Sequence, residues 1–210
     1  MPRKPSLPDS IVMPRRWNRI ATAGLVILLA AVVVCERVTG PPVLLDDDAR
    51  YHDRSFRVSR VVDGDTLDIE APDRGKSVTR IRLWGVDTPE VAHSGRPDIH
   101  FGPEASAFAR RTLDGQTVHI VLVPQRTRGK YGRLLAYVFL DRGGRMFNEM
   151  LLEDGYAYAD LRFKHPYFKQ FKAIEKRARK SGIGLWKNVT LEQMPQWKQR
   201  FERTRTVSGG

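Results

Sequence analysis

The sequence predicts an α+β domain in which five short strands close into a barrel and three helices pack outside it, preceded by one transmembrane or signal helix. Five short runs alternate aliphatic with polar residues, which is typical of strands, and three other runs carry helix signals, an apolar stripe in the first and a closing glycine after the other two. An uncharged apolar run near the N-terminus indicates the membrane helix. With 210 residues, 41% of them hydrophobic, the chain has room for one such domain and its appendages.

Three segments are expected before the domain. Residues 1–19 are a basic arm, in which several prolines oppose regular structure. Residues 20–38 are a transmembrane or signal-anchor helix, because their apolar run approaches the ~20 residues that a spanning helix needs. Residues 39–50 contain Pro41-Pro42 and three successive aspartates without any periodicity, and they are expected to form a linker.

The charges around the apolar run predict where the domain lies. Basic residues precede the run, so the N-terminus should stay in the cytoplasm. We therefore expect a single-pass protein of the cell membrane whose C-terminal domain lies outside the cytoplasm. The alternative is a secreted protein, released when the same segment is cleaved as a signal peptide.

The strands are expected within residues 51–188. Asp63-Gly64 stands between the first two runs and is a strong hairpin-turn signal, so these strands should pair antiparallel. Five short strands of this kind suit a small closed barrel of the OB-fold type. The runs are residues 55–62, 66–70, 78–84, 117–123 and 134–140.

Three helices are expected in the same domain, at residues 103–113, 147–154 and 167–181. Pro103 suits the first turn of a helix, and Gly155 and Gly182 suit the positions that follow a helix end. Residues 189–210 are rich in Gln, Lys and Arg, and we expect them to be a loose tail.

Charge and cysteine content restrict the class of partner. Lysine and arginine total 36 against 24 acidic residues, which gives a net charge of +12 and favours polyanions, either nucleic acid or an anionic membrane surface. Cys35 is the single cysteine, so the chain has no disulfide partner within itself. We expect a monomer.

The strongest candidate for chemistry is the stretch 81–90, where an arginine and two carboxylates stand at the end of a strand. Pro89 lacks a backbone donor and pushes the preceding residue toward extended geometry. This should leave Asp87 and the Thr88 carbonyl free of sheet pairing and able to face a cation. The alternative is a polar turn in which Asp87 caps a neighbouring amide.

Companion motifs elsewhere in the chain favour the chemical interpretation. In order, the motifs are Asp63-Gly64-Asp65-Thr66, Arg82 with Val86-Asp87-Thr88-Pro89-Glu90, Phe101-Gly102-Pro103-Glu104-Ala105, Lys130-Tyr131-Gly132-Arg133-Leu134-Leu135-Ala136-Tyr137, and Asn148-Glu149. Together they resemble the staphylococcal nuclease (thermonuclease) family over about residues 55–186. The resemblance implies an OB-fold and calcium-dependent hydrolysis of DNA and RNA with low sequence specificity.

The resemblance also implies roles for individual residues. Ca²⁺ would be held by two carboxylates and one main-chain oxygen, those of Asp65, Asp87 and Thr88. Two phosphate-binding arginines and a general base would act in catalysis, namely Arg82, Arg133 and Glu90. Contacts to the terminal phosphate, the sugar and the base would come from Lys130, Tyr131 and Phe163. Leu161 and Phe163 stand where the family has tyrosines, so base preference and affinity are expected to differ.

These residue types suit phosphodiester hydrolysis. Negative charge concentrates on the phosphoryl oxygens in the transition state, and a planar guanidinium can give such oxygens two parallel hydrogen bonds. An oxygen-only ligand set favours calcium over zinc, and the histidines lack zinc-like spacing (His93, His100, His119, His165). Two other functions stay open: a non-catalytic OB-fold domain that binds nucleic acid while tethered at the membrane, and a protein whose basic surface meets anionic lipid.

Overall fold

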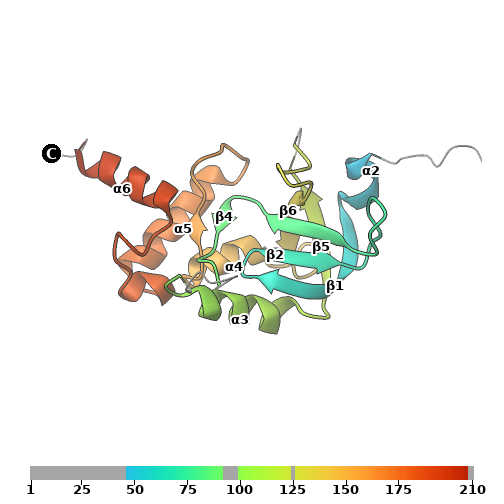
Figure 1. The fold of residues 1–210 in the computed structure, drawn as a ribbon, viewed down its shortest axis with the longest axis horizontal. Coiled ribbons are helices and arrows are strands. Elements are labelled where there is room, and N and C mark those ends of the chain that lie inside the picture. Colours follow the sequence, from blue (N-terminus) through green and yellow to red (C-terminus); the bar gives the residue numbers. More distant parts are fainter. Residues whose placement is uncertain (1–45, 92–98, 124–125, 208–210) are drawn as a thin grey trace, which may run out of the picture. The chain divides into compact units, whose positions relative to one another are not determined.

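A five-stranded barrel forms the centre of the domain (Figure 1). The computed structural model describes residues 46–91, 99–123 and 126–207. The strands hydrogen-bond in the order β1-β2-β3-β6-β5 and the barrel is closed, which confirms the predicted OB-fold-like architecture. The strands are β1 (Arg54–Asp63), β2 (Thr66–Ile69), β3 (Thr79–Leu83), β5 (Thr117–Leu122) and β6 (Leu134–Phe139).

The hairpin between β1 and β2 forms at the predicted turn. Asp63 pairs with Thr66, so Gly64 and Asp65 make the connection. A side chain at position 64 would collide with another part of the chain, because a Cβ on Gly64 would lie 2.7 Å from Thr88 Oγ1. Glycine at this position therefore lets the turn pack directly against Thr88.

Strands β3 and β6 close the barrel as a parallel pair, with Ile81 opposite Leu134. A parallel pair needs a long crossover, and the chain between these strands supplies it with β5 and a helix, α3 (Gly102–Leu113). The interior is filled by aliphatic side chains that are almost completely buried, including Leu67, Ile81, Ile120 and Val138. Alternation along β3 turns Arg80 and Arg82 away from this interior.

A second, two-stranded sheet lies beside the barrel. Strand β4 (Val86–Asp87) pairs antiparallel with β7 (Tyr158–Ala159), and Asp87 is opposite Tyr158. The expectation that Asp87 would be free of sheet pairing was therefore wrong for its backbone. The partner strand comes far later in the chain, so the local effect of Pro89 could not reveal it.

The three predicted helices are present as α3, α4 (Phe147–Glu153) and α5 (Phe168–Lys180), followed by a short 3₁₀ helix, η1 (Gly184–Lys187). Asn148 on α4 is fully buried. Its Oδ1 accepts a hydrogen bond from the Val138 amide at 3.0 Å, and its Nδ2 donates one to the Trp84 carbonyl at 3.0 Å. The Asn148 side chain thereby fixes the end of β3 against β6.

The prediction of a linker at residues 39–50 is corrected for its last part, which belongs to a short helix, α2 (Asp47–Tyr51). Arg128 binds this helix, with Nη2 2.5 Å from Asp47 Oδ1 and Nη1 2.8 Å from Asp73 Oδ2. Tyr51 is fully buried in the core. The linker was expected because these residues lack periodicity, and a missing period does not reveal a basic partner that is distant in sequence.

The predicted loose tail, residues 189–210, is also corrected. Residues Gln196–Val207 form a helix, α6, at the C-terminal end of the described chain (Figure 1). Met194 and Trp197 are each 7% exposed, and Lys198 is 2% exposed. Part of this segment is therefore anchored by burial, including burial of a lysine that a hydrophobic pattern cannot identify.

The basic arm (1–19), the membrane helix (20–38) and most of the predicted linker lie outside the described residues. Within residues 46–91, 99–123 and 126–207, none of the helices has both the length and the apolar character needed to cross a membrane.

Candidate active site

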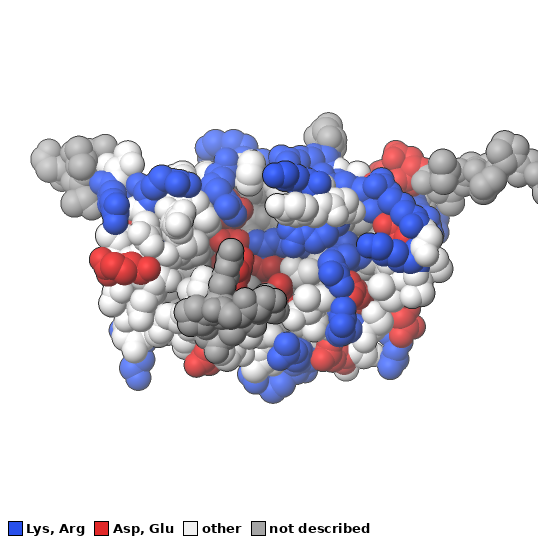
Figure 2. All heavy atoms as spheres, viewed as in Figure 1, with Lys and Arg blue, Asp and Glu red and all other residues white. Residues whose placement is uncertain are grey.

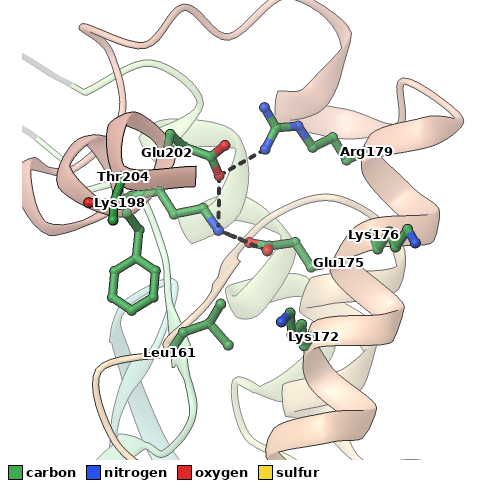
Figure 3. A pocket seen from close by; sticks show the side chains of 9 residues that line it. Leu161, Lys172, Glu175, Lys176, Arg179, Lys198, Glu202 and Thr204 are labelled. Atoms are coloured by element: carbon green, nitrogen blue, oxygen red, sulfur yellow. Dashed lines mark hydrogen bonds and ion pairs between the residues drawn. The ribbon is translucent and has the colours of Figure 1, made fainter. Parts of the chain in front are cut away.

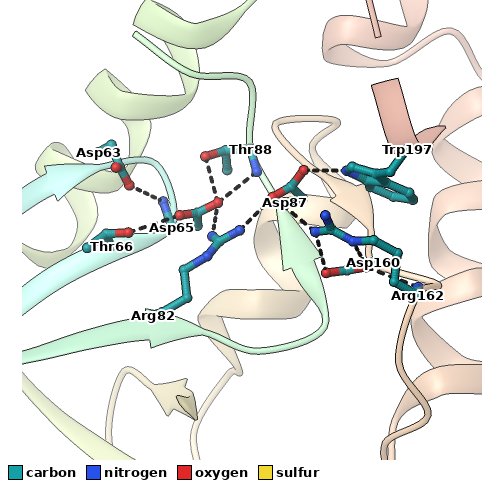
Figure 4. A network of polar contacts seen from close by, with 9 residues as sticks. All are labelled: Asp63, Asp65, Thr66, Arg82, Asp87, Thr88, Asp160, Arg162 and Trp197. Carbon is teal, nitrogen blue, oxygen red and sulfur yellow. Dashed lines mark hydrogen bonds and ion pairs between the residues drawn. The ribbon is translucent and has the colours of Figure 1, made fainter. Parts of the chain in front are cut away.

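The Arg82 guanidinium lies between two carboxylates, those of Asp65 and Asp87 (Figure 4). Arg82 Nη2 donates to Asp87 Oδ1 at 2.6 Å, and Nη1 forms an ion pair with Asp65 Oδ2. The three residues come from three elements: the β1–β2 turn, β3 and β4. The structure thus brings together three residues that the sequence assigned to metal binding and catalysis.

The Asp65 carboxylate is held in place by its neighbours. Its Oδ2 accepts hydrogen bonds from the Thr88 amide at 2.9 Å and from the Thr88 hydroxyl at 3.1 Å. Its Oδ1 accepts one from the Thr66 hydroxyl at 3.1 Å. Asp65 is only 6% exposed, so these donors replace the water that a free carboxylate would bind.

The pKa of Arg82 reflects its burial and its charged neighbours. Burial lowers the pKa of Arg82, and the Asp87 carboxylate opposes that effect. The positive charge of Arg133 lowers the pKa of Arg82 further. An anion bound near both guanidinium groups would offset this repulsion.

A cleft of about 340 Å³ opens beside Arg82. Its lining includes five of the residues that the sequence assigned to phosphate and substrate binding, which are Arg82, Lys130, Tyr131, Arg133 and Phe163. Arg126 and Arg162 also line the cleft, and the sequence interpretation gave neither a specific role. The cleft therefore concentrates cationic side chains around a space beside the two carboxylates.

Aromatic rings form part of the wall. Phe163 stacks on Trp84 with ring centroids 5.3 Å apart, and the Arg126 guanidinium lies 5.4 Å from the Phe163 ring centre. Tyr131 is 75% exposed, and the charged ends of Lys130 and Arg133 lie within 6 Å of its ring centre. Exposed rings beside cations can stack on nucleobases while the cations meet phosphates.

Comparison with known proteins gives the family. The family model described as "Staphylococcal nuclease homologue" matches residues 80–188, which is more than half of the chain. The chain belongs to the staphylococcal nuclease family. The match covers β3, β4, the cleft residues that follow them and α5.

Individual members of the staphylococcal nuclease family align over most of the chain. A thermonuclease of Staphylococcus hyicus is 35% identical over 173 residues, which cover 80% of this chain and 98% of that protein. A thermonuclease of Staphylococcus intermedius is 36% identical over 170 residues, covering 79% and 96%. Endonuclease YhcR of Bacillus subtilis is 34% identical over 149 residues, 66% of this chain and 12% of that much longer protein.

Glu90 follows the β4 segment that this family shares. Its side chain is exposed, and its carbonyl accepts a hydrogen bond from the Ile99 amide at 3.0 Å. Gly102 at the start of α3 packs against the same carbonyl, because a Cβ there would lie 2.4 Å from it. The backbone of Glu90 is therefore fixed. Among the described residues, its carboxylate forms no hydrogen bond or ion pair with Arg82 or with the two aspartates.

The staphylococcal nuclease fold here presents an oxygen-only set of possible metal ligands. Asp65 and Asp87 both approach one cationic group, Arg82, so their carboxylates converge on a common point. Convergent carboxylates suit a hard divalent cation better than a soft one. Within the described chain, no cluster of three or more His, Cys, Asp or Glu side chains could hold a metal by itself.

Sequence reasoning missed two residues that contact Asp87. Trp197 Nε1 donates a hydrogen bond to Asp87 Oδ2 at 2.7 Å, and Arg162 Nη2 lies 3.7 Å from Asp87 Oδ1 (Figure 4). Trp197 belongs to the segment predicted to be loose, so nothing local connected it with the site. Arg162 could have been identified from its place between Leu161 and Phe163, the two residues that stand where the family has tyrosines.

Proposed function

We propose that the chain is a calcium-dependent nuclease that hydrolyses phosphodiester bonds of DNA and RNA with little sequence preference. The observation that supports this most directly is the position of Arg82, which lies between Asp65 and Asp87 and also lines a cleft shared with Arg133. Membership of the staphylococcal nuclease family supports the nuclease activity itself.

Arg82 and Arg133 would bind the scissile phosphate. In the transition state its oxygens gain negative charge, so fixed positive groups lower the barrier most when they are already in place. Arg82 is suited to this role because its side chain is 15% exposed and its position is fixed by ion pairs with two carboxylates. A water-poor site makes each charge interaction stronger than it would be in bulk solvent.

Asp65, Asp87 and the Thr88 carbonyl would hold Ca²⁺. When bound, the ion would supply positive charge beside the phosphate and favour loss of a proton from water. The hydrogen bonds from Thr88 and Thr66 fix the Asp65 oxygens before any ion arrives. A preformed carboxylate loses less entropy on binding than a mobile one.

Glu90 would accept a proton from the attacking water. Its carboxylate is exposed, and its backbone is fixed two residues after Thr88. A general base must reach the proton that it removes, and a carboxylate at the edge of the cation site is suited to that. Whether Glu90 takes the proton or orients the water, its loss should reduce turnover more than substrate binding.

The cleft is suited to binding a chain of nucleotides without selecting a particular base sequence. Cations meet phosphates and aromatic rings stack on any base, and neither interaction reads base edges. Figure 2 shows Lys and Arg side chains gathered over the upper half of one face, with acidic side chains near the centre of the view. A surface of this kind attracts polyanions at long range.

The alternative, a non-catalytic domain that binds nucleic acid, is not favoured. Buried carboxylates beside a phosphate-binding arginine oppose phosphate binding by their charge, so a simple binding surface gains nothing from Asp65 and Asp87. A nuclease can use the same carboxylates as ligands of a cation. The presence of the acidic pair therefore supports catalysis over binding alone.

We also propose that residues 20–38 tether a monomeric domain to the cell membrane, with residues 51–188 outside the cytoplasm. The uncharged run after a basic arm supports this arrangement. Release as a secreted protein after cleavage is the alternative, and mass spectrometry of the mature N-terminus distinguishes the two.

The nuclease proposal is tested by incubating the purified protein with DNA and with RNA, in Ca²⁺ or in a calcium chelator. We expect cleavage of both polymers with Ca²⁺ and none with chelator. Glu90→Gln should abolish most turnover, and Glu104→Gln, a change at an exposed glutamate on α3, should not. Binding without cleavage by the unaltered protein in Ca²⁺ would support the non-catalytic alternative.

A further inference from the structure

The C-terminal helix α6 reaches the Asp87 carboxylate through Trp197. The indole Nε1 donates to Asp87 Oδ2 at 2.7 Å, while Arg82 Nη2 donates to Oδ1 at 2.6 Å. The two donors bind different oxygens of one carboxylate, so together they set the orientation of its plane. Helix α6 lies outside residues 80–188, which are the part that the family model matches.

The residue that follows Trp197 anchors the helix. Lys198 Nζ lies 2.8 Å from each carboxylate oxygen of Glu175 on α5, and the Lys198 side chain is 2% exposed (Figure 3). A buried ion pair with this geometry strongly disfavours separation of its partners, because either charge alone would be desolvated without compensation. The first turn of α6 is therefore fixed to α5.

Glu175 connects this anchor back to the strand that carries Asp87. Its Oε1 accepts a hydrogen bond from the Ala159 amide at 3.0 Å, and Ala159 on β7 pairs with Val86 on β4. The route from Asp87 through β4, β7, Glu175 and α6 thus returns to Asp87 at Trp197. Such a closed set of contacts limits how far the indole and the carboxylate can move apart.

Arg162 fixes the other side of the indole. Its guanidinium lies 4.7 Å from the Trp197 ring centre and forms a two-bond contact with Asp160, each bond 2.8 Å long. A guanidinium over an indole face is a favourable cation–π arrangement. The Trp197 ring is thereby held between its hydrogen bond to Asp87 and the stacked charge of Arg162.

We propose that Trp197 is a positioning residue, which orients Asp87 for cation binding and makes α6 part of the active site. The inference rests on the proposed role of Asp87 as a Ca²⁺ ligand. Hydrogen bonds to a ligating carboxylate hold its oxygens in the direction of the ion, and loss of such a partner typically weakens metal affinity about 10- to 100-fold.

The test compares Trp197→Phe with Trp186→Phe in the full chain. Phenylalanine keeps an aromatic ring under Arg162 and removes the N–H donor, together with part of the volume of the indole. Trp186 is also nearly buried, at 8% exposure, and its indole N–H makes no hydrogen bond to Asp87, so its change is the matched control. Calorimetric titration with CaCl₂ gives the affinity, urea unfolding gives the stability, and initial rates across Ca²⁺ concentrations give the activity.

We expect Trp197→Phe to raise the Ca²⁺ dissociation constant about 10-fold, with a urea midpoint close to that of Trp186→Phe. Activity at saturating Ca²⁺ should recover most of the unaltered rate. A second measurement needs no variant: in the unaltered protein, the NMR signal of the Trp197 indole N–H should move on addition of CaCl₂, and that of Trp186 should not.

Two results overturn the inference in different ways. If the unaltered protein binds Ca²⁺ and cleaves DNA, while Trp197→Phe binds Ca²⁺ as tightly as Trp186→Phe and the Trp197 signal stays still, the positioning role is wrong and the nuclease proposal stands. If the unaltered protein neither binds Ca²⁺ nor cleaves nucleic acid, the proposed function fails and the inference fails with it.

Discussion

Arg82 and Asp87 are joined by a 2.6 Å hydrogen bond although they belong to different sheets. Arg82 lies on β3 of the barrel, and Asp87 lies on β4 of the two-stranded sheet. Between them Gly85 has a φ of 78°, which lets the chain turn sharply from one sheet to the other. This turn places a phosphate-binding candidate and a metal-binding candidate side by side.

Replacement of Arg133 by lysine tests the need for a planar phosphate ligand. Lysine keeps the charge but cannot give two parallel hydrogen bonds, so kcat should fall about 100-fold while KM changes little. Arg145→Lys is the control, because Arg145 is 64% exposed and pairs with Glu153 outside the cleft. Steady-state kinetics on DNA measure both variants, and a kcat for Arg133→Lys near that of the control would contradict the role.

The barrel and its neighbouring helices could be predicted because their signals are local. Alternating side chains mark the strands, and the Asp63-Gly64 turn marks the hairpin. The resemblance to a nuclease family then brought together residues that no local pattern connects, such as Asp65 and Arg82. The structure places these two in contact.

Other features could not be predicted, because their partners are distant in sequence. The β4–β7 sheet joins two strands of two residues each, which is too short for any periodic signal. Helix α2 depends on Arg128, and the first turn of α6 depends on a buried Lys198. From the sequence alone, a charged residue is expected at the surface, and its burial can be recognised only when its partner is known.

Phe163→Ala tests whether the aromatic wall binds bases. Phe163 is 40% exposed and stacks on Trp84, so its loss should remove a stacking surface without leaving a cavity in the core. We expect KM for single-stranded DNA to rise roughly 10-fold with little change in kcat, since stacking is worth ~1–3 kcal/mol per base. Ile183→Ala, matched in exposure at 41%, should leave KM unchanged. Equal KM values for the two variants would exclude the stacking role.

Arg128→Ala tests the ion pairs that hold α2. The Arg128 side chain is 12% exposed and binds both Asp47 and Asp73, so its loss leaves two mostly buried carboxylates without their closest basic partner. The free energy of unfolding should fall by about 3 kcal/mol. Arg142→Ala removes an arginine that is 75% exposed and should cost at most ~1 kcal/mol. Urea unfolding at neutral pH compares the two, and similar losses would contradict the structural role.

The ion pair between Arg128 and Asp47 predicts that the stability of the protein depends on pH. The hydrogen bond from Arg128 lowers the pKa of Asp47, so the folded state favours the ionised carboxylate. The stabilisation is fully present above the pKa of an unfolded aspartate, about 3.9, and is lost as pH falls through the lowered folded value. The stability difference between the unaltered protein and Arg128→Ala should therefore shrink below about pH 4. A difference that stays constant down to pH 2 would exclude this linkage.

Glu175→Gln tests whether the Lys198–Glu175 ion pair holds α6 in place. It also shows whether the hydrogen bond from Trp197 to Asp87 depends on that ion pair. The change removes one charge and leaves Lys198, 2% exposed, with only the carboxylate of Glu202, whose Oε1 lies 3.7 Å away. Unfolding free energy should fall by about 3 kcal/mol, because a buried ammonium then lacks its closest counter-charge. Glu153→Gln breaks an ion pair at a glutamate that is 41% exposed and should cost at most ~1 kcal/mol. If α6 is held mainly through Glu175, the variant should also weaken Ca²⁺ binding in the same direction as Trp197→Phe. A loss of stability with unchanged Ca²⁺ affinity would instead mean that the indole remains against Asp87 without the buried ion pair.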